Sequence, residues 1–393
     1  MSDSPDDANN SQPLCLDITP DKLLVLRSNE IWWRDRYEMF LSHGYQLRPR
    51  LRPGWVPSWV ANGKRPLQSE DFFSIIAPKN NIVDAVRTSD GEQVLLKKVK
   101  TEGSEIDLAL YLSSPELRED PRNHCVPILD DFQDDADETI TYIVMPLLRE
   151  FDNPIFGSVN ELLDFGDQIF EGLRFMHDHG VAHRYYHLMS ACGAVPSYLL
   201  VHRDCATMNI MMDAKSMYPE GFHPLNKWCD RSGIETAAHY TRSERPPRYY
   251  FTDFGISSYF PPDCEPLVVG SEGRDFQVPE LSKTVPYNPF KTDIFIIGNL
   301  FKNEFFNKYS NVDFLLPLIT VMTQQDPKMR PTASEAQELW KHVRASVAII
   351  NRYWRLQERQ NGYIGAVILD AVSFTRRALR VSQWAPNVSE ILH

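Results

Sequence analysis

Hydrophobic and polar positions follow two different patterns along this chain. Short apolar runs typical of strands begin near residue 71, where S-I-I-A-P-K-N-N-I-V-D-A-V-R predicts strand, turn and strand, and T-S-D-G predicts a hairpin turn into E-Q-V-L-L-K-K-V. One helix is expected among them, because S-E-I-D-L-A-L-Y-L places Ile106, Leu108, Ala109 and Leu112 on one face. The runs C-V-P-I-L-D-D-F and T-Y-I-V-M-P-L-L then continue the strand pattern.

After these runs the pattern becomes helical. Five apolar residues recur at steps of three and four, the spacing of one buried helix face: Leu162, Phe165, Ile169, Leu173 and Met176. The sequence therefore predicts an α+β protein in which a small β-rich part precedes a larger helical part. The connection between the two parts is expected near Met145 to Leu148.

Composition narrows the class of protein. The chain has 393 residues, of which 41 are Lys or Arg and 53 are Asp or Glu, so its formal charge is −12. An acidic chain argues against general binding of nucleic acid or anionic membranes, and no apolar run is long enough for a membrane helix. The acidic start does not resemble a signal peptide, and six scattered cysteines without a C-x-x-C pair fit reduced thiols, so we expect a cytoplasmic or nuclear protein.

The N-terminal region is interpreted as a disordered leader (1–20) and an extension (21–69). The extension holds half of the eight tryptophans, and its stretch L-R-P-R-L-R-P-G-W-V-P-S-W interleaves arginines with Trp and Pro. This segment could stack on single-stranded nucleic acid, or it could dock its Trp rings on the neighbouring domain. The acidic composition favours docking, and no nucleic-acid partner is predicted.

Two short motifs carry the candidate chemistry. V-H-R-D-C-A-T-M-N places Asp204 five residues before Asn209, and the strand-like run Y-Y-F-T-D-F-G follows with Asp253. Upstream lie Lys97, in V-L-L-K, and Glu105, at the head of the predicted helix. In this order the segments resemble the protein-kinase family, whose H-R-D-x-x-x-x-N and D-F-G motifs they match. The sequence around these motifs is similar to that of a divergent fungal branch of the family.

The resemblance implies a two-lobed fold and a phosphotransferase that uses ATP and Mg²⁺ to phosphorylate a Ser/Thr hydroxyl of a protein substrate. Lys97 would grip the nucleotide phosphates and pair with Glu105, Asn209 and Asp253 would hold the metal, and Asp204 would be the catalytic base. The remaining nucleotide contacts would come from three apolar residues: Val83, Met145 and Leu148.

Further matches extend the resemblance over about residues 70–345, with lobes at 70–148 and 149–345 and a helical tail at 346–393. Glu280, in V-P-E, and Arg330 would form a structural ion pair, and Asp293 would anchor the backbone of the catalytic loop. Arg203 would neutralise a phosphate in the activation segment, where the candidates are Ser257, Ser258, Tyr259 and Ser271.

The sequence departs from the family pattern at the phosphate loop. Ile76, Pro78 and Asn81 stand where three glycines are expected, and Leu95 replaces an alanine that would lie against adenine. These changes keep two alternatives open: a pseudokinase that acts as a scaffold or allosteric partner, and a small-molecule phosphotransferase. Ala206 is also a choice more typical of tyrosine kinases.

An unusual stretch precedes the catalytic loop. Residues 185–203 repeat a His-Arg pair, so that His183-Arg184 is followed by His202-Arg203. The stretch is either a true inserted loop or, as we favour, a translated intron, since 19 codons preserve the reading frame. Sequencing the transcript distinguishes the two.

Overall fold

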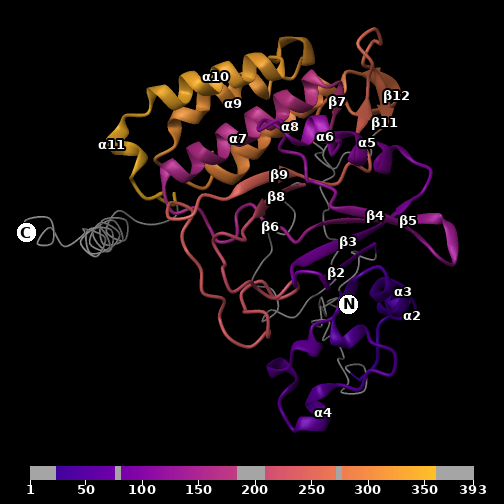
Figure 1. Ribbon diagram of the computed structural model, residues 1–393. Helices are drawn as coiled ribbons and strands as arrows, with labels where there is room; N and C mark the ends of the chain where they lie inside the picture. Colours follow the sequence, from indigo (N-terminus) through magenta and orange to yellow (C-terminus); the bar gives the residue numbers. More distant parts are fainter. Residues whose placement is uncertain (1–23, 76–80, 184–208, 271–276, 360–393) are drawn as a thin grey trace, which may run out of the picture.

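The computed structural model describes residues 24–75, 81–183, 209–270 and 277–359, and it confirms the α+β class (Figure 1). Antiparallel strands dominate residues 24–146, here called the sheet region. Helices dominate residues 149–359, the helical region. Figure 1 shows the helices α7 to α10 stacked on one side of the molecule and the sheet on the other.

The sheet region is built on a five-stranded antiparallel sheet with the order β1-β2-β3-β5-β4. The predicted turn Thr88–Gly91 connects two of its strands, and Gly91 supplies a positive φ of 74° there. The strands are β1 (Tyr45–Leu47), β2 (Ile82–Arg87), β3 (Gln93–Lys100), β4 (Asp130–Asp134) and β5 (Asp137–Pro146).

The edge strand of this sheet differs from the prediction. Ser74 and Ile75, expected in a strand, lie outside any strand, and residues 76–80 fall outside the described part. The strand next to β2 is instead β1, which comes from the N-terminal segment 21–69. The connection from β1 to β2 runs through η1 (Pro49–Leu51), α4 (Ser58–Asn62), η2 (Pro66–Gln68) and η3 (Glu70–Phe72).

Two N-terminal helices, α2 (Ser28–Asp35) and α3 (Tyr37–Ser42), pack against one face of the sheet. We call this the outer face. Trp33 and Phe40 are fully buried there, and the Phe40 ring lies 4.8 Å from the ring of Tyr142 on β5. Arg48 and Arg50 also point inward and are buried, so neither arginine is presented to a nucleic acid.

The inner face of the sheet joins the core of the helical region. The predicted helix forms as α5 (Ser104–Leu112), and the four apolar residues that predicted it are all buried. A short helix, α6 (Pro115–Arg118), follows. Val99 of β3, Ile143 of β5 and the apolar face of α5 belong to one continuous cluster with the helices behind them.

The helical region is centred on α7 (Val159–Asp178), whose five predicted face residues are all fully buried. Ser158 caps this helix by accepting a hydrogen bond from the Glu161 amide. Around α7 lie α8 (Pro289–Leu300), the π-helical turn η4 (Phe301–Phe306), η5 (Asp313–Leu315), α9 (Leu316–Met322), η6 (Pro327–Met329), α10 (Ala333–Ser346) and α11 (Ile349–Arg352).

The helical region also contains small sheets. β6 (Arg149–Glu150), β8 (Ile210–Asp213) and β9 (Arg248–Phe251) form one, with β8 between the other two. The remaining pairs are β7 (Val181–Ala182) with β10 (Ser258–Tyr259), and β11 (Val268–Gly270) with β12 (Ser282–Tyr287). A long segment, residues 214–247, connects β8 to β9 and is called the β8–β9 segment below.

Parts of the predicted ends lie outside the described residues. These are the leader 1–20 and most of the tail, of which the structure describes 346–359 with the single short helix α11 after α10. Among the described helices, none combines the length and the apolar character needed to cross a membrane.

Candidate functional site

Lys97 lies at the centre of the candidate site. It is on β3, its exposed fraction is only 7%, and its cross-strand neighbours are Ile82 on β2 and Ile143 on β5. Its Nζ donates a hydrogen bond to Oδ1 of Asp253 at 2.7 Å and also pairs with Oε1 of Glu105 at the start of α5. The structure therefore brings together three residues that the sequence had placed in one site.

Charge explains how this lysine stays ionised. Burial by itself lowers the pKa of Lys97, but the carboxylates of Asp253 and Glu105 outweigh it and raise the pKa. Burial likewise raises the pKa of Asp253, yet Lys97 more than offsets this, and the net result is a pKa below the usual range. Both partners are therefore charged at neutral pH.

Asn209 and Asp253 lie at the same end of two antiparallel strands. Asn209 directly precedes β8 and Asp253 follows β9, and Ile210 is paired with Phe251 between them. The main-chain oxygen of Asn209 accepts hydrogen bonds from the amide of Thr252, at 2.7 Å, and from its hydroxyl. Asp253 has a positive φ of 65°, which is rare for a residue with a side chain, and in this conformation its carboxylate accepts from Lys97.

The pair Asn209 and Asp253 fits a magnesium ion. The Nδ2 atom of Asn209 is buried and has no hydrogen-bond partner among the described residues, so no such bond through the nitrogen fixes the orientation of this amide. Mg²⁺ commonly takes one or two protein oxygens and completes its octahedron with phosphate oxygens and water. No cluster of three or more His, Cys, Asp or Glu suited to a metal occurs among the described residues.

A buried histidine contacts the end of β8 and β9 at which Asn209 and Asp253 lie. His183 directs Nε2 to the main-chain oxygen of Thr252 at 3.0 Å, and its ring lies 5.1 Å from Phe254. Its amide donates to Oδ2 of Asp293, at 2.8 Å, so Asp293 holds the backbone that leads into residues 184–208. Burial lowers the pKa of His183, which keeps its ring neutral.

The predicted ion pair between Glu280 and Arg330 is confirmed. The Arg330 guanidinium donates to both oxygens of Glu280, at 2.6 and 2.8 Å, and the Arg330 side chain is fully buried. This bidentate pair fixes the segment just before β12 against the loop before α10.

The expected apolar nucleotide contacts divide between the two faces of the sheet. Met145 is cross-strand to Leu95 on the inner face, and Leu148 belongs to the same core. Val83 instead packs in the outer core, opposite the side on which Lys97 lies, because its cross-strand partner is Leu96. The β2 residue on the side of Lys97 is Ile82, which the sequence analysis did not identify.

The structure does not place every predicted residue. Asp204, Arg203, Ala206 and Ser271, together with the stretch 185–203, lie outside the described residues. Among the candidate phosphorylation sites, the Ser257 hydroxyl is buried and donates to the His183 carbonyl. Tyr259 is about half exposed, and its ring lies 5.7 Å from that of Tyr111 on α5.

Comparison with known proteins adds no family: no family model matches this chain, and no curated protein matches it. The chemistry of the site must therefore be argued from its own residues. A buried cation held between two carboxylates, beside an amide and a carboxylate on adjacent strand ends, is suited to binding a polyanion with a divalent cation.

Proposed function

We propose that this chain is a two-lobed, protein-kinase-like phosphotransferase that uses ATP and Mg²⁺. The observation that carries the proposal is the position of Lys97, paired with Glu105 and Asp253 at once, with Asn209 on the strand end beside Asp253. In this proposal the sheet region is the N-lobe and the helical region is the C-lobe.

In this proposal each residue of the site has a separate role. Lys97 binds the α/β-phosphates of the nucleotide, and Glu105 keeps it directed toward them. Asp253 and Asn209 supply the protein oxygens for Mg²⁺, which when bound neutralises phosphate charge. The hydroxyl oxygen of the substrate attacks the γ-phosphorus as the bond to the bridging oxygen breaks. ADP keeps that electron pair, and Asp204 accepts the hydroxyl proton.

The acceptor is proposed to be a Ser or Thr of a protein. The Glu280–Arg330 pair stabilises the segment just before β12, and Val269 of β11 and Val285 of β12 offer exposed apolar surface on the adjacent strand pair. A platform of this kind suits a polypeptide better than a small alcohol or amine. The glycine-free stretch 76–81 keeps the pseudokinase as the second candidate, since Pro78 has no N–H to offer a phosphate.

Calorimetry of Mg·ATP binding is the first test, performed on the full chain and on a chain lacking residues 185–203. We expect both forms to bind with one-to-one stoichiometry, and Asp253→Asn to weaken binding in both. Binding by the shortened form alone would mean that the stretch blocks an otherwise competent site. A folded protein that binds no Mg·ATP in either form is a pseudokinase.

Phosphate transfer is tested separately with radiolabelled ATP. Protein acceptors and small acceptors, such as an aminoglycoside and choline, are offered in parallel. We expect label in protein, and we expect Asp204→Asn to abolish its transfer. Unchanged transfer by this variant would remove Asp204 as the base, and label only in the small acceptors would assign the chain to the small-molecule class.

A further inference from the structure

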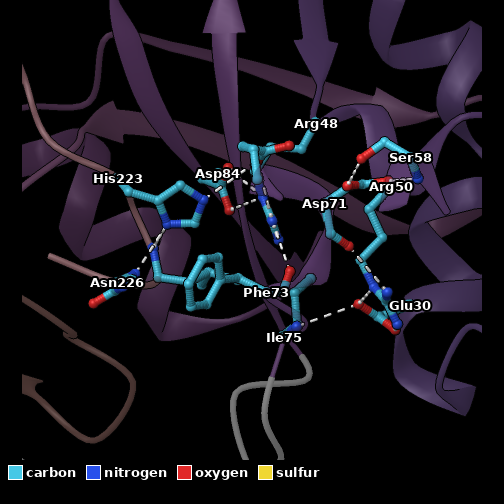
Figure 2. Close-up of polar contacts among 12 residues, drawn as sticks. Glu30, Arg48, Arg50, Ser58, Asp71, Phe73, Ile75, Asp84, His223 and Asn226 are labelled. Carbon is cyan, nitrogen blue, oxygen red and sulfur yellow. Dashed lines mark hydrogen bonds and ion pairs between the residues drawn. The ribbon is translucent and has the colours of Figure 1, made fainter. Parts of the chain in front are cut away.

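The β8–β9 segment reaches across to the sheet region through one buried histidine. His223 is fully buried and lies beside Phe73 (Figure 2). Its Nε2 lies 3.3 Å from Oε1 of Glu70. Its ring also packs 4.9 Å from the ring of Phe73. The segment leaves β8 and enters β9 at the strand ends opposite Asn209 and Asp253. The contact therefore joins the two strands that carry the proposed metal ligands to the opposite lobe.

Hydrogen bonds determine the tautomer of the His223 ring. Its Nδ1 accepts from the amides of Leu225, at 3.2 Å, and Asn226, at 2.9 Å. An imidazole nitrogen that accepts carries no proton, so the proton of the neutral ring is on Nε2. His223 therefore donates to Glu70 and, with its other nitrogen, caps its own loop.

From Glu70 the contacts continue into the sheet. Arg48 lies with Nη1 3.5 Å from Glu70, donates to the Phe73 carbonyl at 2.8 Å, and pairs with Asp84 on β2 at 2.9 Å. Burial alone would lower the pKa of Arg48, but Asp84 and Glu70 outweigh it and raise the pKa, so the guanidinium stays charged. Asp84 is cross-strand to Leu95, two residues before Lys97 on β3.

A second buried ion pair holds residues 70–75 from the other side. Arg50 pairs with Glu30 at 2.8 Å and donates to the Asp71 carbonyl, and Glu30 accepts from the Ile75 amide (Figure 2). Asp71 in turn accepts from Ser58. Residues 70–75 are thus fixed by side chains on both sides, although this stretch has no strand partner.

We propose that His223 is a positioning residue which, through Glu70 and Arg48, holds the N-lobe strand of Lys97 in alignment with the C-lobe residues Asn209 and Asp253. The inference rests on the proposed function. The contacts that run from His223 through Glu70 and Arg48 to Asp84 form one connection between the lobes. The hydrogen bond from Lys97 to Asp253 forms a second connection at a separate place. A buried contact of this kind resists lobe rotation more than an exposed ion pair does.

Two substitutions separate the two roles of the ring. His223→Asn keeps an acceptor near the Nδ1 position, which preserves the loop cap, but it is too short to reach Glu70. His223→Gln keeps a donor near the Nε2 position and loses the cap. Lys215→Met is the matched control, because Lys215 joins the start of the same segment to Glu92 of the N-lobe through an exposed pair at 2.6 Å.

The measurements are amide hydrogen exchange without nucleotide and calorimetric affinity for Mg·ATP. For His223→Asn we expect the Phe72 and Phe73 amides to exchange about tenfold faster, with Leu225 and Asn226 within about twofold of wild type. His223→Gln should give the reverse pattern. The Kd for Mg·ATP should rise about fivefold in His223→Asn, and by less than about twofold in the other two variants.

Three results would overturn the proposal. One is exchange at Phe72 and Phe73 that His223→Asn leaves unchanged, and another is a Kd equal to wild type despite faster exchange. The third is an effect of Lys215→Met as large as that of His223→Asn. If the wild type binds no Mg·ATP, the proposed function fails instead, and the exchange pattern alone still decides whether His223 holds residues 70–73.

Discussion

The Nζ of Lys97 lies 2.7 Å from Oδ1 of Asp253, although 156 positions separate the two residues along the chain. Lys97 is on a central strand of the sheet region, whereas Asp253 follows a strand of the helical region. Since Glu105 contacts the same ammonium, one cation joins β3, α5 and the end of β9. The site is therefore complete only when the sheet region and the helical region are correctly positioned relative to each other.

Lys97→Met tests this shared cation. Methionine has a similar length but no charge, so a phosphate would lose its ligand and the two carboxylates would lose their common partner. We expect kcat/KM for phosphate transfer to fall by about 10²-fold to 10³-fold. Lys98→Met is the control, because Lys98 faces the other side of the sheet and lies 4.1 Å from the Trp32 ring. Equal losses in both variants would contradict the assignment.

Glu280→Gln tests the buried pair of the C-terminal part. The substitution keeps the shape of the side chain but leaves the guanidinium of Arg330 buried without an opposite charge. We expect the free energy of unfolding to fall by about 3–5 kcal/mol, measured by urea denaturation. Removing the exposed Lys341–Glu338 pair by Lys341→Met should leave it nearly unchanged. A small effect of Glu280→Gln would mean that Arg330 has alternative partners.

Local periodicity explains what the sequence predicted well. Helices α5 and α7 were predicted because each buries a single apolar face, and the strands β3 and β5 because each is a bounded apolar run. The pair Glu280 and Arg330 was predicted from the resemblance of their motifs to those of a known family. Hydrophobic periodicity alone could not have predicted this contact, because the two residues are far apart in the sequence. These features depend on residues close in sequence or on a recognisable motif.

Long-range pairing explains what the sequence did not predict. β1 has only three residues, and its place beside β2 depends on partners about 40 positions later. Val83 was expected beside the nucleotide, but strands alternate with a period of two, so a difference of one residue in register exchanged it for Ile82. No local sequence pattern identified His223, because its partner Glu70 is 153 positions away.

Gly166→Ala tests the packing of α7 against α10. A Cβ added at Gly166 would lie 2.1 Å from Cζ2 of Trp340, whose indole is buried and donates to Asp167. Because the ring is held by this hydrogen bond, it cannot move aside easily, and we expect a loss of about 1–3 kcal/mol in unfolding free energy. Gly103→Ala is the control, since its Cβ would lie 3.9 Å from the nearest side-chain atom. Equal stability of Gly166→Ala and wild type would show that α10 can shift.

Asp152→Asn tests a carboxyl group whose charged form is disfavoured in the folded protein. Burial raises the pKa of Asp152 to about 6, and Glu304 adds to the effect while Lys308 opposes it. In the unfolded chain the pKa is about 3.9, so between about pH 4 and 6 the folded protein binds more protons and loses stability as the pH rises. The advantage of the variant over wild type should therefore grow by about 1–2 kcal/mol between pH 4 and pH 7, after allowance for partial solvent screening. Urea denaturation across this range measures it, with Asp131→Asn as the control for the change in net charge. An advantage independent of pH, or one that shrinks as the pH rises, would contradict the raised pKa.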